Sequence, residues 1–218
     1  MKICFHVDDC KLVHKSSRQM DRMIDYHRKE YESIFEDGSG KMTVKRGKVY
    51  EYLGMRIDYS EPGKAKVRML NYVEEILTAF AKADPKATGT KSSAAPENLF
   101  VVNEECEKLS TDKSVHFHNL VAKTLYTTKR ARPDTCTAVA FLTTRVQEPN
   151  LDDWNKLSHM MRYIRGTRQL PLMYRIMCDS LFQSSKSGSR TLVVKNATAV
   201  QVSSRALLVA YNVFATKL

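Results

Sequence analysis

The sequence lacks any apolar run long enough to cross a bilayer, and it lacks a Cys-x-x-Cys pair. Its cysteines are odd in number and scattered, namely Cys4, Cys10, Cys106, Cys136 and Cys178. That pattern argues against a disulfide framework and against a zinc ribbon. The first residues are interrupted by His6 and Asp8, so they contain no signal-peptide core. These absences predict an intracellular protein, of the cytoplasm or nucleus, without a membrane partner.

Acidic residues are in short supply, because 24 Asp and Glu face 35 Lys and Arg, giving a formal net charge of +11. A surplus of that size favours a polyanionic partner, since each cation placed on a phosphate releases a condensed counterion. Nucleic acid is the first candidate and an anionic membrane surface the second; an inert basic surface is the alternative. The 218 residues suffice for one large domain or two small ones with a genuine core.

The first 84 residues alternate strand and helix patterns. Residues 2–7 and 10–14 predict a β-hairpin around Asp8-Asp9, and a helix follows from Ser16 or Ser17 to about Glu36. The later pattern predicts one long strand over 48–60 with Gly54 inside it, followed by a turn at 61–64 and a return strand over 65–70. A helix is then predicted over 71–83, with Asn71 and Glu74 as its capping box.

The second half of the chain is mainly helical in pattern. Residues 85–112 carry Lys, Gly, Ser, Pro and Asn without periodicity, which predicts a linker and a domain boundary. The remaining elements are expected as helices at about 113–129, 134–147 and 152–165, strands at 171–178 and 191–202, and a last helix at 203–215.

The sharpest local motif is Phe5-His6-Val7-Asp8-Asp9. Adjacent carboxylates at a hairpin tip repel each other, so they suit a divalent cation that neutralises them. Mg²⁺ prefers hard oxygen ligands and is commonly held by few carboxylates together with substrate phosphates. A solvated acidic turn is the alternative, because Asp is a common turn residue.

A strand, His6-Val7-Asp8-Asp9, a second strand and an amphipathic helix together resemble the palm of copia-type retrotransposon reverse transcriptases, whose signature is Tyr-x-Asp-Asp. Four further segments resemble that family in the same order: Tyr52-Leu53-Gly54-Met55-Arg56-Ile57, residues 71–80 (NYVEEILTAF), Leu125-Tyr126 with Ala131-Arg132-Pro133-Asp134, and Pro149 with residues 161–167 (MRYIRGT). The similarity covers roughly residues 1–175.

The resemblance implies RNA-directed DNA synthesis by two-metal chemistry. It makes Asp8 the metal-binding catalytic carboxylate and Asp9 its supporting neighbour, with Mg²⁺ as the ion and Mn²⁺ as its alternative. It places His6, in the position of the family's Tyr, together with Leu53 and Gly54 near the primer. The implied partners are an RNA or DNA template–primer and a deoxynucleoside triphosphate, and the oligomeric state stays open.

The same resemblance implies that parts of the family's enzyme are missing. The family's polymerase needs a further metal-binding Asp on a strand well before the Asp-Asp hairpin, so the chain is expected to be an inactive fragment. Cys178-Asp179-Ser180-Leu181-Phe182 resembles the opening strand of a ribonuclease H domain, which would make Asp179 its first carboxylate; a solvated Asp179 is the alternative. The alternative function is a non-catalytic nucleic-acid-binding remnant of a retroelement.

Two basic clusters are candidate contacts to a nucleic-acid backbone, with ordinary solvated helix faces as the alternative. Their members are Lys123, Lys129, Arg130 and Arg132 in the first, and Arg162, Arg165 and Arg168 in the second. Elsewhere, His116 and His118 are expected to form a surface pair without a metal. Trp154 and Tyr163 are expected to be core anchors.

The expected fold class is therefore α+β. The resemblance implies a partial polymerase palm with primer-grip strands and the first thumb helix over 1–84, a linker over 85–112, a helical thumb or connection region over 113–169, and an incomplete ribonuclease H-like strand layer over 170–218.

Overall fold

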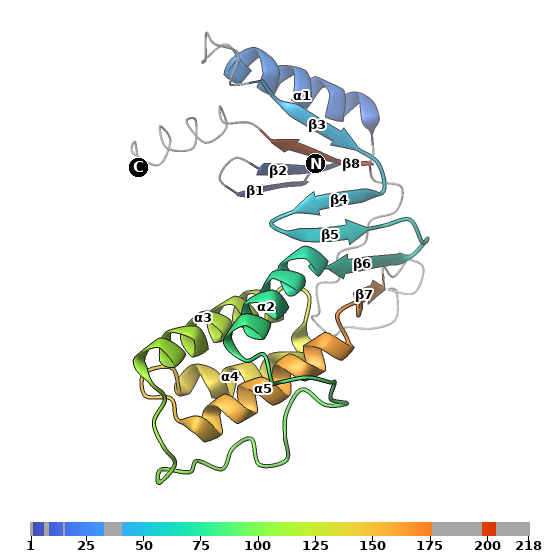
Figure 1. Cartoon of the computed structure of the whole chain (residues 1–218). Helices are drawn as coiled ribbons and strands as arrows, with labels where there is room; N and C mark the ends of the chain where they lie inside the picture. The colour runs from blue at the N-terminus through green and yellow to red at the C-terminus, as the bar shows by residue number, and fades with distance from the viewer. Residues whose placement is uncertain (1, 7–8, 15, 33–40, 176–197, 204–218) are drawn as a thin grey trace, which may run out of the picture. The chain divides into compact units, whose positions relative to one another are not determined.

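A computed structural model describes residues 2–6, 9–14, 16–32, 41–175 and 198–203 (Figure 1). The chain divides into two compact units, which we call the strand unit (residues 1–66 and 173–218) and the helical unit (residues 67–172). The predicted boundary at 85–112 is therefore wrong. The chain passes between the units at residues 66–67 and 172–173.

The first sheet of the strand unit consists of β1 (Lys2–His6), β2 (Asp9–His14), β8 (Thr198–Ser203) and β3 (Thr43–Arg46), in the order β1-β2-β8-β3. Each neighbouring pair in this sheet is antiparallel. The sheet confirms the predicted N-terminal hairpin. It also confirms the end of the predicted 191–202 strand, whose residues 191–197 lie outside the described part of the chain. Ser203, the first residue of the helix predicted at 203–215, belongs to β8, and residues 204–215 lie outside the described part.

Helix α1 (Ser17–Tyr31) packs on this sheet. Its buried positions Met20 and Ile24 are one helical turn apart, and they join Cys10 and Leu12 of β2 in one apolar cluster with Met42. The helix is confirmed, although it ends five residues before the predicted Glu36, and residues 33–40 lie outside the described ranges.

The second sheet has the order β4-β5-β6-β7, formed by β4 (Val49–Tyr52), β5 (Met55–Asp58), β6 (Lys64–Arg68) and β7 (Leu172–Arg175). The single long strand predicted over 48–60 is wrong, because the chain reverses at Leu53-Gly54 and β4 pairs antiparallel with β5. The turn before β6 is confirmed, with Gly63 at a φ of 72°. Its carboxylate Glu61 accepts hydrogen bonds from Lys64 and Lys66, which lower the pKa of Glu61 to about 2.

The helical unit contains α2 (Leu70–Ala83), α3 (Thr111–Thr128), the short 3-10 helix η2 (Pro133–Thr135), α4 (Cys136–Thr144) and α5 (Leu151–Gly166). All four predicted helices are therefore present. The capping box predicted at Asn71 and Glu74 is wrong, because α2 begins at Leu70 and its N-cap, Met69, makes no side-chain cap. A capping box does start α5, where Asn150 and Asp153 exchange hydrogen bonds.

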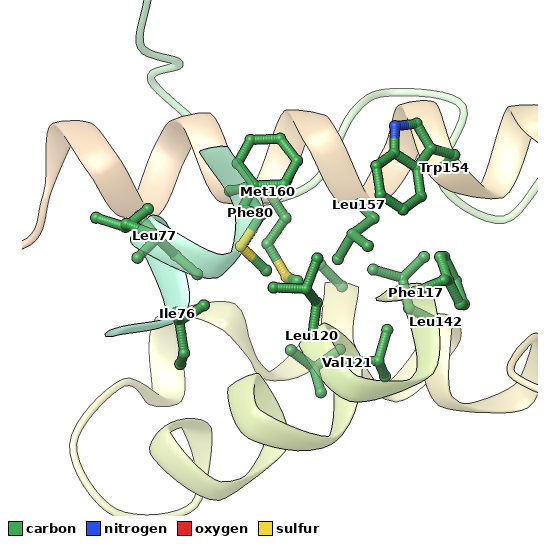
Figure 2. Close-up of a cluster of buried hydrophobic side chains, with 14 of the residues drawn as sticks. Ile76, Leu77, Phe80, Phe117, Leu120, Val121, Leu142, Trp154, Leu157 and Met160 are labelled. Carbon is green, nitrogen blue, oxygen red and sulfur yellow. The ribbon is translucent and has the colours of Figure 1, made fainter. Parts of the chain in front are cut away.

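One apolar core joins the four helices (Figure 2). Phe80 of α2, Phe117 of α3, Leu142 of α4 and Leu157 of α5 are each fully buried. Trp154 is 2% exposed, which confirms it as a core anchor, and its indole Nε1 donates to Asp84 Oδ2 at 3.0 Å. Burial of large apolar side chains is the main stabilising term of such a bundle.

The segment 85–112 has no helix or strand before Thr111, yet it packs as part of this core. Leu99 is 2% exposed, and Lys156 Nζ of α5 donates to the Val101 carbonyl. An isolated antiparallel bridge joins Lys108 to Asn150. The lack of periodicity in this segment correctly predicted the absence of helix and strand. The prediction that the segment is a linker is wrong, because it packs against the helices.

The described chain combines β-sheets with helices, and most of the helices lie in the helical unit, which is compatible with the expected α+β class. The assignment of these elements to a palm, a thumb and a ribonuclease H-like layer stays a prediction.

Candidate nucleic-acid interface

The β1–β2 hairpin positions the acidic motif of the strand unit. Its register pairs His6 with Asp9 and Phe5 with Cys10, and Val7 and Asp8 lie outside the described residues. Asp9 is thus the first residue of β2, whereas the sequence predicted that it belongs to the turn. The antiparallel pairing of the two predicted strands is confirmed. Their metal-binding role stays a prediction.

The two faces of the hairpin have different surroundings. Cys10 and Leu12 are 2% and 0% exposed within the cluster that includes α1. Successive side chains of a strand point to opposite faces, so Lys11 lies on the other side. There the Lys11 ammonium donates to the Tyr59 hydroxyl at 3.1 Å and lies 5.0 Å from the Tyr59 ring centroid and 5.6 Å from that of Tyr50.

The β4–β5 hairpin is fastened to this second face. Cys4, the cross-strand partner of Lys11, has its Sγ 3.5 Å from the Tyr52 hydroxyl. Together with the Lys11–Tyr59 contact, this hydrogen bond joins the two hairpins at two points. Burial and the Gly47 carbonyl act oppositely on Tyr50, and burial dominates, so the pKa of Tyr50 is raised.

The candidate primer-binding residues Leu53 and Gly54 form the tip of the β4–β5 hairpin. Their φ values are 52° and 73°, and two successive residues with positive φ are typical of a type I′ turn. Glycine occupies such a position without strain, whereas leucine rarely does. Gly54 therefore indicates a chain reversal, and it does not lie inside a strand as the sequence predicted.

The first basic cluster, around the end of α3, is divided by the structure. Lys129 is exposed, Lys123 is half-buried, and the Arg130 guanidinium lies 3.7 Å from the Tyr126 ring centroid. Arg132 is only 3% exposed and is fully engaged inside the helical unit. The prediction that Arg132 contacts a phosphate is therefore wrong, because a buried guanidinium with protein partners cannot reach a nucleic-acid backbone.

Arg132 instead joins the loop after α3 to the end of α5. It donates to Asp134 Oδ2 at 2.7 Å and to Thr167 Oγ1 at 2.7 Å, and the Tyr163 hydroxyl donates to Asp134 Oδ2 at 2.9 Å. Burial by itself raises the pKa of Asp134, but the Arg132 hydrogen bonds and charge outweigh it, so the pKa lies below its usual value. Burial and Asp134 together raise the pKa of Tyr163. Tyr163 is thus a half-buried polar anchor packed beside the core.

The second basic cluster, on α5 and just after it, is partly bound to the segment 85–112. Arg165 Nη1 donates to the carbonyls of Ala87 and Gly89 at 2.8 and 3.1 Å. Arg162 is half-buried, and its Nε is buried without a hydrogen-bond partner among the described residues. Arg162 is therefore more buried than a residue on a solvated helix face. One guanidinium nitrogen of Arg165 is already hydrogen-bonded to the protein backbone.

Arg165 nevertheless borders an open groove between α2 and α5, with a volume of about 430 Å³. The residues that line it are Glu74, Leu77, Thr78, Ala81, Lys82, Arg165 and Arg168. The five from α2 are spaced i, i+3, i+4, i+7 and i+8, which is one face of a helix. We call this the α2–α5 groove. Sequence reasoning missed Lys82, whose only signal was its helical spacing from Glu74 and Thr78.

Comparison with known proteins finds a distant similarity. The chain is 25% identical over 199 residues, which are 88% of this chain and 75% of the other, to the Uncharacterized mitochondrial protein AtMg00810 of Arabidopsis thaliana. No family model matches the sequence. No solved structure matches the fold.

The other candidate sites have simple outcomes. Asp179 lies outside the described residues. His116 and His118 are both exposed, as predicted, and in the described part of the chain no three His, Cys, Asp or Glu side chains gather closely enough to hold a metal ion. Within those same ranges, no helix is long and apolar enough to span a membrane.

Proposed function

We propose that this chain is a nucleic-acid-binding part of an RNA-directed DNA polymerase of the copia-type retrotransposon class. The observation that carries the proposal is the β1–β2 hairpin, whose register pairs His6 with Asp9, the two described residues of the motif His6-Val7-Asp8-Asp9. The similarity to a plant mitochondrial protein over most of both chains gives the proposal a distant relative, although that relative's name states no activity.

The chemistry proposed for the strand unit, as a part of the intact polymerase, is metal-assisted phosphoryl transfer. Asp8, supported by Asp9, would supply hard oxygen ligands to Mg²⁺ or Mn²⁺. In such chemistry a primer 3′-hydroxyl would attack the α-phosphorus of a deoxynucleoside triphosphate and pyrophosphate would leave, and a bound ion would supply positive charge for the charge that develops. Leu53 and Gly54, at the tip of a hairpin fastened to the acidic one, are the proposed contacts to the primer.

The role proposed for the helical unit is contact with the nucleic-acid backbone. The α2–α5 groove presents Lys82, Arg165 and Arg168 along an apolar floor. Cationic rims suit phosphates, and an apolar floor suits the sugars between them. Lys129, exposed at the end of α3, adds a further cation.

A binding experiment tests the nucleic-acid role. The purified chain should bind a labelled primer–template in fluorescence anisotropy, with little sequence preference and with an affinity that falls steeply as salt rises. Replacing Lys82 and Arg168 together by Gln should weaken binding and reduce the slope of log K against log salt by about 2, since each lost phosphate contact removes about 0.9. Replacing Lys45 and Lys48 by Gln is the matched control, because both lysines are exposed in the strand unit outside this groove. Binding that is absent at low salt would refute the nucleic-acid role.

A metal experiment separates the polymerase from a non-catalytic remnant. Mn²⁺ titration followed by electron paramagnetic resonance should show a weak site that Asp8→Asn removes, because asparagine keeps the shape but loses the charge. Asp25→Asn, an exposed aspartate of α1, is the control. Two-metal chemistry needs more carboxylates than one hairpin supplies, so we expect no primer extension by this chain. A Mn²⁺ site indifferent to Asp8→Asn would favour the remnant, and primer extension would overturn the reasoning about missing ligands.

A further inference from the structure

The α2–α5 groove contains one carboxylate among its cations. Of its seven lining residues three are basic, namely Lys82, Arg165 and Arg168, and only Glu74 is acidic. Within the described residues, no carboxylate lies within ion-pair distance of Lys82. An acid among the cations of a groove opposes the binding of any polyanion there, so its position calls for an explanation.

Glu74 is paired with one of the groove's own arginines. Its Oε1 lies 3.7 Å from the Nε of Arg168, and the two side chains are 47% and 52% exposed. Such an exposed pair is weak and reversible, because water and salt screen it. The Arg168 guanidinium is therefore held inside the groove without being buried, and an incoming anion can take the place of the Glu74 carboxylate.

We propose that Glu74 is a built-in competitor for the nucleic-acid backbone, in which its carboxylate occupies Arg168 in place of a phosphate oxygen. This inference rests on the proposed function and adds a regulatory element to the same groove. A phosphate that reaches Arg168 must break the Glu74 pair and then lie close to a displaced negative charge. The groove consequently holds a strand more weakly than its three cations alone would, and a weakly held strand can move along it.

The neighbouring residue Glu75 supplies a matched control. It belongs to the same helix and is exposed, but it does not line the groove. Glu74→Gln and Glu75→Gln change the net charge by the same amount and remove it from almost the same place. Any difference between them in affinity for a polyanion therefore comes from the groove and not from the overall charge of the protein.

The experiment measures the dissociation constant of each variant for a labelled single strand and for a primer–template at low salt. Glu74→Gln should bind about two- to five-fold tighter than Glu75→Gln, the size of effect that an exposed ion pair gives. In a double-mutant cycle, the gain from Glu74→Gln should shrink when Arg168 is already Ala, because the competition acts through Arg168. Thermal unfolding of each variant verifies that the folded protein is being compared.

The outcomes distinguish this inference from the proposed function. Equal affinities of Glu74→Gln and Glu75→Gln would overturn the competitor role while leaving nucleic-acid binding intact. A gain from Glu74→Gln that is unchanged in the Arg168→Ala background would also overturn it. If the unsubstituted chain binds neither probe at low salt, the proposed function fails first, and Glu74→Gln would then be expected to bind neither.

Discussion

The Arg132–Asp134 pair allows a specific test of what holds the helical unit together. Arg132 is 3% exposed and Asp134 is 26% exposed, and three donor–acceptor distances of 2.7–3.2 Å join them. Asp134→Asn keeps the shape and one acceptor oxygen, but it removes the negative charge that neutralises the buried Arg132 guanidinium. Removing one partner of a buried pair costs about 3–5 kcal/mol, and the partial exposure of Asp134 reduces this to about 2–4 kcal/mol.

That magnitude is a large part of the stability of a domain of this size. Marginal domains have only about 5–15 kcal/mol, so Asp134→Asn should lower the melting temperature by on the order of 10 °C. Urea unfolding followed by circular dichroism measures the change in the free energy of unfolding. Glu104→Gln, an exposed carboxylate of the same unit, is the control and should change it by less than about 0.5 kcal/mol.

The pH dependence gives this prediction a second, independent readout. The pKa of Asp134 is lower in the folded protein than its usual value of 3.8. A depressed pKa contributes stability that is present above the unfolded pKa and is lost as the pH falls through the folded pKa. The stability gap between the natural chain and Asp134→Asn should therefore be full at pH 6 and should narrow below about pH 4. A gap that is small at pH 6, or that stays constant to pH 3, would refute the assigned role of the pair.

Two further substitutions test the turn and the core. Gly54→Ala should lower the unfolding free energy of the strand unit by about 1 kcal/mol, whereas Leu53→Gly should not lower it, because both positions have positive φ. Thermal circular dichroism measures both changes. Equal losses of stability would mean that the turn is wrongly described. Trp154→Phe should cost about 1–3 kcal/mol in urea unfolding through the lost hydrogen bond to Asp84 and the smaller ring. Asp84→Asn, which keeps an acceptor oxygen for the indole, should cost less, and a larger loss there would contradict this account.

Sequence periodicity alone determined the local structure of much of the described chain. The helices at α2, α3, α4 and α5 were predictable because apolar residues recur at helical spacing, and the N-terminal hairpin because short apolar strands flank two polar residues. The charge surplus and the acidic motif, which are the basis of the functional proposal, are also properties of the sequence. The β4–β5 reversal was missed because leucine is unusual in the left-handed region, so Leu53-Gly54 carried only half of the usual turn signal.

Only the tertiary structure decided which of the charged residues are available to a ligand. Arg132 and Lys129 are both cations of the same basic cluster in the sequence. In the structure Arg132 is buried against Asp134, whereas Lys129 is exposed. The α2–α5 groove joins Lys82 to Arg165 and Arg168, more than 80 residues apart, because α2 and α5 pack against each other. Local patterns set helix and strand, since these depend on neighbours in the chain. Burial and groove formation depend on contacts between distant segments, which the order of residues does not state.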